Sequence, residues 1–202
     1  MATRSTTARK AAEQRQRKSN AGREKSAPDA MSLLEHDHMV IKQLLNRLSA
    51  TTEGAVKQRE ALLKRIETEL KTHTRIEEEI FYPAFKESAK RTDEHLYYEA
   101  VEEHNLAELA FSDLKSTDTE TKEFSAKAKV LKDIVLHHAE EEEEQIMFVK
   151  ARQTMTSREL QDLAEQMQSR KEALASDIVT RMVKTTRGTL AKIIAGEKRK
   201  AA

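Results

Sequence analysis

Histidine and glutamate recur along this chain in a pattern that suits a metal site. Two segments hold the motif His-x-x-x-Glu, the first at His73 and Glu77 and the second at His138 and Glu142. Residues four apart lie on the same face of a helix, so each motif directs one imidazole and one carboxylate toward a common point. Both motifs fall within stripes of apolar residues, where the core is expected. They are therefore predicted to bind cations inside the fold.

Two single histidines complete the pattern. His38 and His104 each occupy a position where the helical spacing predicts an apolar residue. The interval is 66 residues between these two histidines and 65 residues between corresponding members of the two motifs. This repeat predicts two helical hairpins, each with a histidine on its first helix and a motif on its second. The predicted metal ligands are His38, His73, Glu77, His104, His138 and Glu142.

Cations would stabilise a buried cluster of this composition. An ionised carboxylate in an apolar interior is strongly destabilised unless it is paired, and two would also repel each other. Bridging carboxylates with imidazoles on the outer positions form the ligand set of dinuclear iron or manganese sites in helical bundles. Zinc accepts the same atoms, but structural zinc sites favour thiolates and the chain has no cysteine. The predicted cofactor is a pair of iron or manganese ions, with zinc as an alternative.

The composition favours a helical fold that can position these residues. Four glycines and two prolines in 202 residues are too few for a many-stranded sandwich or barrel. The predicted fold class is therefore all-α. Two antiparallel hairpins give an up-down-up-down four-helix bundle. A capping-box pattern at Thr156 and Glu159 begins an additional C-terminal helix.

Apolar stripes mark the inward faces of the predicted helices. The second stripe runs on to Ile80 and Ala84, and its helix is predicted to end or bend near Pro83. The fourth stripe opens after the turn residues 116–121 and runs on to Val149.

Charge divides the chain into an acidic body and two basic ends. Residues 1–28 carry eight Lys and Arg against two Glu, and residues 184–202 carry six against one. Since the whole chain has a net charge of +1, residues 29–183 carry about −10. The first 28 residues lack Leu, Ile, Val and Phe, so they are predicted to be disordered. The predicted organisation is a disordered basic tail over 1–28, the bundle over 29–152, an additional helix packed on it over 153–176, and a basic amphipathic extension over 177–202.

The basic ends suggest partners of several kinds. They suit weak, nonspecific binding to nucleic acid, although no aromatic residues interleave with the charges. The extension could instead pack on the bundle, on a second subunit to form an oligomer, or on a membrane surface. No uncharged run approaches the roughly 18 residues of a membrane-spanning helix. We therefore predict no transmembrane segment and a cytoplasmic location.

Residues 33–152 resemble a hemerythrin-like domain, the four-helix diiron family named for its His-His-Glu motif. The matching stretches are Glu-His-Asp-His ending at His38, His-x-x-x-Glu-Glu-Glu-Ile-Phe-Tyr-Pro beginning at His73, Glu-Glu-His ending at His104, and His-His-Ala-Glu-Glu-Glu beginning at His137.

The resemblance implies a particular arrangement of the site. Two irons share Glu77 and Glu142 as bridges, with a solvent oxygen between them and an open position for dioxygen or nitric oxide. Oxygen-carrying members usually have a second histidine four residues after the one on the third helix, where this chain has Glu108. The difference favours sensing, iron handling or oxidant consumption over reversible oxygen carriage. Glu108 itself is a candidate further ligand.

The register of the fourth helix has two alternatives. It holds one residue more than is usual in the family between His138 and the Met147–Phe148 pair, and a one-residue bulge would let Glu143 compete with Glu142. His137 lies about 100° from His138 around a helix, so only one of them faces the core. Helical register favours His138.

The predicted function is metal binding in a hemerythrin-like protein that binds or senses dioxygen, nitric oxide or iron. One alternative is a diiron peroxidase or oxidase that acts in oxidative-stress defence. Another is an architectural protein whose basic ends bind nucleic acid. Two further histidines, His36 and His95, are predicted to be surface residues, the second of them in a turn.

Overall fold

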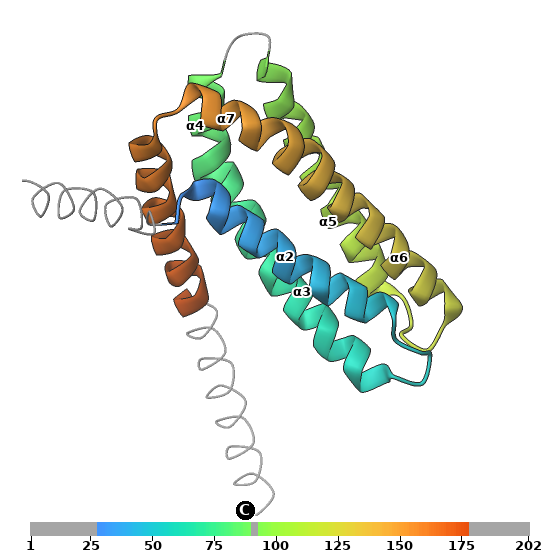
Figure 1. The fold of residues 1–202 in the computed structure, drawn as a ribbon. Helices are drawn as coiled ribbons and strands as arrows, with labels where there is room; N and C mark the ends of the chain where they lie inside the picture. The colour runs from blue at the N-terminus through green and yellow to red at the C-terminus, as the bar shows by residue number, and fades with distance from the viewer. Residues whose placement is uncertain (1–27, 90–92, 178–202) are drawn as a thin grey trace, which may run out of the picture.

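The structure, a computed structural model, describes residues 28–89 and 93–177. Every regular element within these two ranges is a helix (Figure 1). The predicted disordered N-terminal tail and nearly all of the predicted C-terminal extension lie outside the described residues. None of the described helices is both long enough and apolar enough to cross a membrane.

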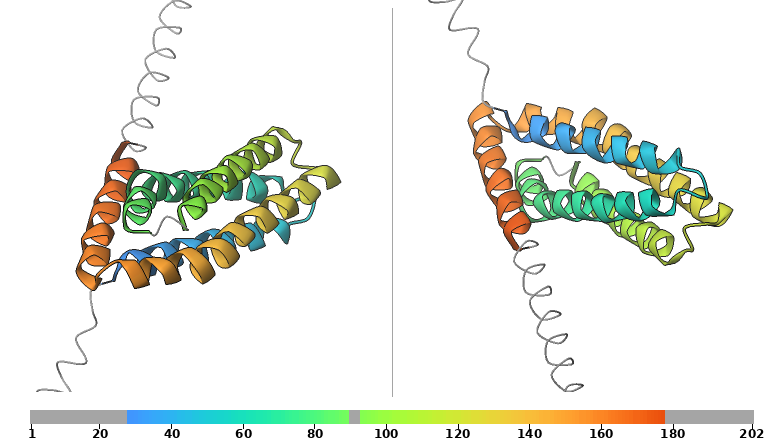
Figure 2. Two further views of the ribbon diagram at one scale, coloured as in Figure 1. Left: turned by 90° about the horizontal axis from the view of Figure 1, so that it is seen from above. Right: turned by 90° about the horizontal axis from the view of Figure 1, so that it is seen from below.

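Four helical rods form the bundle. The first is α2 (Ala30–Ser49) and the third is α5 (Glu94–Ser116). The second rod joins α3 (Val56–Ile76), the π-helical segment η1 (Glu77–Phe81) and α4 (Tyr82–Ser88). The fourth joins α6 (Lys122–Leu136), the π-helical segment η3 (His137–Met147) and α7 (Phe148–Thr154). The rods alternate in direction (Figures 1 and 2), which confirms the predicted up-down-up-down bundle.

An additional helix over 157–177 runs across one end of the bundle (Figure 2). The predicted capping box begins it. The backbone N–H of Thr156 donates to Glu159 Oε2 at 2.7 Å, and the N–H of Glu159 donates to Thr156 Oγ1 at 3.3 Å. Leu160, Leu163 and Met167 are buried against the apolar side chains at that end of the bundle. This contact confirms the predicted extra helix.

Short polar caps fix where the first and fourth rods begin. Asp29 accepts a hydrogen bond from the N–H of Ser32 at 2.9 Å, and Thr121 accepts one from the N–H of Phe124 at 3.1 Å. Such caps satisfy N–H groups that have no partner within the helix. His95 is the second residue of α5, so its predicted turn position was wrong, although its surface position is confirmed.

The buried guanidinium of Arg59 ties two loops together at the opposite end of the bundle. Its side chain is 1% exposed and lies over the ring of Phe124. It donates to Thr51 Oγ1 at 2.8 Å, to Ser125 Oγ at 2.7 Å and to the backbone carbonyls of Thr51 and Thr119. The loops after α2 and after α5 are therefore held to the start of α6 by one side chain.

The core consists of two apolar clusters with a polar layer between them. The cluster near the additional helix includes Met31, Leu34, Phe81, Phe85, Phe148 and Met167. The cluster at the other end includes Ile41, Leu45, Leu48, Ile66, Phe111, Phe124 and Leu131. On α2, for example, His38 lies between Leu34 of the first cluster and Ile41 of the second. The polar layer is where the predicted ligands lie.

The two π-helical segments shift the register of the rods by about one residue. In η1 the N–H of Tyr82 bonds to the carbonyl of Glu77, five residues earlier. As a result Phe81 and Phe85 are the buried residues, where α-helical spacing from Glu77 predicted Ile80 and Ala84. Those two are only partly buried.

The same shift corrects the prediction for the end of the fourth rod. Phe148 is buried after η3, whereas Val149 is 47% exposed. Pro83 does not end the second rod, because it stands in the first turn of α4, where proline's missing N–H is tolerated.

Candidate metal centre

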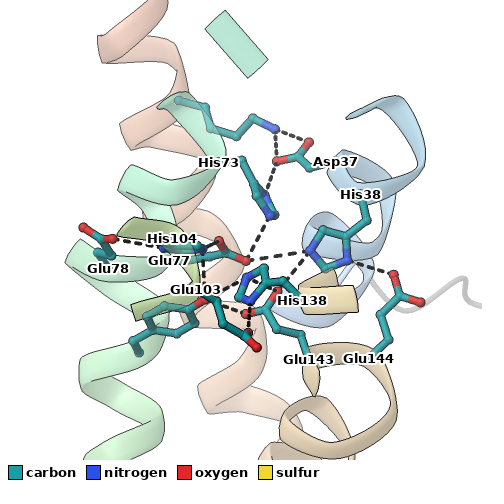
Figure 3. A network of polar contacts seen from close by, with 12 residues as sticks. Asp37, His38, His73, Glu77, Glu78, Glu103, His104, His138, Glu143 and Glu144 are labelled. Atoms are coloured by element: carbon teal, nitrogen blue, oxygen red, sulfur yellow. Dashed lines mark hydrogen bonds and ion pairs between the residues drawn. The ribbon is translucent and has the colours of Figure 1, made fainter. Parts of the chain in front are cut away.

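Six titratable side chains meet in the polar layer (Figure 3). Each rod supplies at least one. They are His38 from α2, His73 from α3, Glu77 from η1, His104 from α5, and His138 and Glu143 from η3. All six are buried, and both glutamates are fully so.

Four of these side chains form one group of candidate ligand atoms. The Nε2 atom of His73 lies 3.2 Å from Glu77 Oε1, and the Nε2 atom of His38 lies 3.1 Å from Glu143 Oε2. His38 Nε2 is also 3.9 Å from Glu77 Oε1. Ligand atoms of the four residues all lie within 4.8 Å of one another. One ion would therefore find two imidazoles and two carboxylates.

A second group shares Glu77 with the first. The Nε2 atom of His104 lies 3.3 Å from Glu77 Oε2, and ligand atoms of Glu77, His104 and His138 lie within 4.8 Å of one another. The two oxygens of Glu77 thus face histidines of different groups. That position suits a carboxylate that bridges two ions.

Five of the six predicted ligands lie in the layer, and Glu142 does not. Glu143 is fully buried there, while Glu142 is partly exposed and faces His137 at 3.9 Å. The prediction that Glu142 faces the site was wrong because η3 is π-helical, so the inward residue after His138 comes five positions later. The bulge considered for this helix therefore extends along the whole of η3.

The remaining candidates lie outside the layer. His138 is the inward member of its pair, and the side chain of His137 is 51% exposed. Glu108 and His36 are exposed. Glu108 therefore contributes to neither group.

The polar layer fits a pair of cations. Several of its buried atoms have no hydrogen-bond partner: His38 Nε2, Glu77 Oε1, Glu77 Oε2 and Glu143 Oε2. Buried polar atoms that make no hydrogen bond are rare in protein interiors, because leaving them without one is costly. Metal ions would satisfy these atoms together.

Comparison with known proteins identifies the domain. Residues 29–151 match the Hemerythrin HHE cation binding domain family. The chain belongs to this family. A solved structure similar to it is a hemerythrin HHE cation binding domain-containing protein from Mycobacterium kansasii. The two are 27% identical with a TM-score of 0.67, and the match covers 77% of this chain and 92% of that one. No protein of curated function matches.

Family membership and the buried cluster together indicate a metal-binding protein. The additional helix over 157–177 lies beyond the residues that match the family.

Each of the four histidines in the polar layer of this HHE domain also faces a carboxylate with its other ring nitrogen (Figure 3). The distances from Nδ1 are 2.8 Å for His38 to Glu144, 3.0 Å for His104 to Glu78, 2.7 Å for His138 to Glu103 and 3.7 Å for His73 to Asp37. Three of these carboxylates lie within hydrogen-bond distance of Nδ1, and such outer carboxylates fix the ring and its tautomer, so that Nε2 is presented to a metal. Asp37 lies farther from its ring. The sequence prediction missed these four residues, although acidic neighbours of the histidines were a signal for them.

Tyr82 brings a hydroxyl group into the layer that the sequence prediction also missed. Its side chain is fully buried, and the hydroxyl donates to Glu143 Oε1 at 2.8 Å. The hydroxyl oxygen of Tyr82 also lies 3.2 Å from His104 Nε2 and 3.4 Å from His138 Nε2. Burial and the nearby charge of Glu143 raise the pKa of Tyr82 well above its usual value. In the metal-free HHE domain the phenol is therefore a neutral hydrogen-bond donor beside the second group.

Two histidines of the polar layer, His104 and His38, have a raised pKa and hold a proton tightly. Burial alone would lower the pKa of His104, but the nearby carboxylates of Glu77 and Glu78 raise it to about 10. Burial likewise opposes the charged form of His38, and the nearby carboxylates of Glu143 and Glu144 raise its pKa well above normal. Burial would raise the pKa of Glu77, but the charge of His73 and the close imidazoles of His104 and His38 hold it well below normal. Metal binding would therefore release protons.

A cavity of about 290 Å³ leads to the layer, and all four histidines line it. Apolar side chains form part of its other walls, among them Ile41, Leu70, Ala107, Val135 and Leu136, and the charged side chains of Glu35, Lys42, Glu140 and Glu144 also line it. At its outer side Lys42 of α2 forms an ion pair with Glu140 of η3.

Proposed function

We propose that this HHE domain holds a non-haem diiron centre and binds or senses dioxygen, nitric oxide or iron itself. The observation that carries the proposal is the position of Glu77, whose two oxygens face two separate histidine groups. One ion would be held by His38, His73, Glu77 and Glu143. The other would be held by Glu77, His104 and His138.

The donor atoms favour iron. Both groups offer only imidazole nitrogens and carboxylate oxygens, a set that dinuclear iron and manganese sites use in helical bundles. Zinc would accept the same atoms, but its structural sites usually close at four ligands. The group around His104 and His138 has three residues, which leaves coordination positions open beside the cavity.

When bound, the iron pair supplies one-electron chemistry and an open position for a small ligand. The chain supplies the surroundings. The apolar part of the cavity wall, formed by residues such as Ile41, Leu70 and Val135, favours an uncharged molecule. The Tyr82 hydroxyl lies at 3.2 and 3.4 Å from Nε2 of His104 and His138, where it could donate to an oxygen atom of that molecule.

The test is metal content together with an optical spectrum of protein purified without added metal. The expected result is about two irons per chain, with charge-transfer bands that change when anaerobically reduced protein meets dioxygen or nitric oxide. Fewer than one iron per chain after anaerobic reconstitution, with no such bands, would contradict the proposal.

A diiron peroxidase or oxidase is the second candidate, and the buried Tyr82 donor favours it. Turnover separates the two functions, because the ligands are the same. Steady-state consumption of hydrogen peroxide with an added reductant should be lost in His73→Ala and kept in His36→Ala, since His36 is exposed. If both variants consumed hydrogen peroxide only at the rate of free iron, the result would exclude a peroxidase. Binding or sensing would then remain as the proposed function.

A further inference from the structure

One charged side chain of the additional helix reaches the edge of the polar layer. Lys171 lies on the helix over 157–177, and its Nζ atom is 2.5 Å from Oδ1 and 2.6 Å from Oδ2 of Asp37. The two residues are 134 positions apart in the chain. Both oxygens of Asp37 are thus bound by a residue that lies beyond the HHE match.

Asp37 is the outer carboxylate of His73 and differs from the other three. Its side chain is 10% exposed, whereas those of Glu144, Glu78 and Glu103 are 34%, 39% and 23% exposed. Its Oδ2 atom lies 3.7 Å from Nδ1 of His73, and that nitrogen has no hydrogen-bond partner. Asp37 thus faces His73 as an ion-pair partner, and Lys171 holds that carboxylate through both of its oxygens.

We infer that Lys171 is a positioning residue of the metal centre, acting through Asp37 on His73. The inference rests on the proposed two-ion site. Without the ammonium group, Asp37 would be an almost buried carboxylate with no cationic partner except the imidazole, and it would turn toward solvent. His73 would then lose its outer partner, and the ion held by His38, His73, Glu77 and Glu143 would bind less tightly.

The same contact links the additional helix to metal binding. A contact that strengthens ion binding must itself be strengthened when the ion binds, because such coupling is reciprocal. Ion binding at the His73 group should therefore hold the 157–177 helix more firmly against the bundle, which hydrogen exchange of its backbone amides would report.

A neighbouring residue provides a matched control. Arg170 joins the same helix to the bundle through Glu79, with Nε to Oε2 at 2.6 Å and Nη2 to Oε1 at 3.1 Å. Glu79 belongs to neither ligand group. Arg170→Met therefore removes an ion pair that docks this helix and leaves Asp37 untouched.

The experiment measures the two binding steps of full-length protein for Zn²⁺ by competition with a chelating indicator, and for Co²⁺ by visible absorption. Lys171→Met should weaken one of the two steps about 10- to 100-fold. It should also alter the visible absorption of Co²⁺ bound in that step. Arg170→Met should leave both steps unchanged, and Lys171→Arg should restore most of the lost affinity.

Asp37→Asn provides a second variant with nearly unchanged side-chain shape. It should weaken the same binding step, and combining it with Lys171→Met should add little further loss. Circular dichroism of each metal-free variant checks that the helical fold is kept.

Three results would overturn the inference. Equal weakening in Lys171→Met and Arg170→Met would assign the effect to general docking of the helix. Unchanged binding in Lys171→Met, with two ions bound by the wild type, would remove Lys171 from the site while leaving the diiron proposal intact. Fewer than two ions bound by the wild type would contradict the diiron proposal itself, and the inference with it.

Discussion

Glu143 Oε2 lies 3.6 Å from Nε2 of His138, although the two residues are five positions apart in η3. An α-helix would bring residues four apart to the same face and would turn Glu143 away. Because the π-helical turn is wider, the side chain of Glu143 lies in the polar layer.

The first prediction concerns the glutamates of η3. Glu143→Gln should lower the number of tightly bound ions below two, because Glu143 is fully buried with its Oε2 atom toward His38. Glu142→Gln is the matched control and should still bind two, since its side chain is 31% exposed. Metal-to-protein ratios after dialysis against buffered Zn²⁺ or anaerobic Fe²⁺ would measure both. Greater loss in Glu142→Gln would contradict the assignment.

The second prediction concerns the buried phenol. Tyr82→Phe should lower the free energy of unfolding of metal-free protein by about 1–3 kcal/mol, because Glu143 Oε1 loses its donor. Urea denaturation would measure the change. Tyr98→Phe should change the free energy by less than about 0.5 kcal/mol, since Tyr98 is 53% exposed. A similar effect of both substitutions would mean that the buried hydrogen bond stabilises little.

The third prediction concerns pH. The pKa of His104 is raised from 6.5 to about 10 in the metal-free fold, so the folded state holds this proton more tightly than the unfolded state. The resulting stabilisation is fully present below pH 6.5 and is lost as pH rises toward 10. The free energy of unfolding of metal-free protein, measured by urea denaturation, should therefore be lower at pH 9.5 than at pH 6.5 by about 1 kcal/mol or more.

Two controls belong to the pH experiment. His104→Gln should reduce the pH dependence, because it removes one of the imidazoles whose pKa is raised. Metal-loaded wild type should show a smaller decline, since metal-bound imidazoles are neutral. An equal decline in wild type and His104→Gln would contradict the role given to this residue.

The fourth prediction separates stability from metal binding. Arg59→Met should lower the free energy of unfolding by about 2–4 kcal/mol, because it leaves the carbonyls of Thr51 and Thr119 without this donor. Arg65→Met, at a side chain that is 58% exposed, should cost less than about 0.5 kcal/mol. Both variants should still bind two ions. Loss of an ion in Arg59→Met would show that the loop end and the metal layer are coupled.

The sequence was sufficient to predict the helical bundle, the additional helix and the presence in the layer of His38, His73, Glu77, His104 and His138. These residues could be found because a polar residue in an apolar stripe is conspicuous, and because the intervals repeat. Helical periodicity then places each histidine on the inward face.

Two parts of the site could not be predicted, for different physical reasons. Residues 140–144 are all glutamates, so only the backbone conformation decides which of them faces the core. That conformation is π-helical, and a π-helical turn has no clear marker in residue type. Tyr82 and Lys171 reach the layer through tertiary packing. The contact between Lys171 and Asp37 spans 134 residues, and helical spacing carries no information at that distance.

The polar layer also bears on how the bundle unfolds. It separates two apolar clusters, one beside the additional helix and one beside Arg59. Without cations, the groups that face each other in this layer are histidines and glutamates whose attraction depends on protonation. The two ends of the bundle should then melt as partly independent units. Bound ions, held by residues from all four rods, would join them into one cooperative unit, so calorimetry should show a broad or double transition without metal and a single sharp one with it.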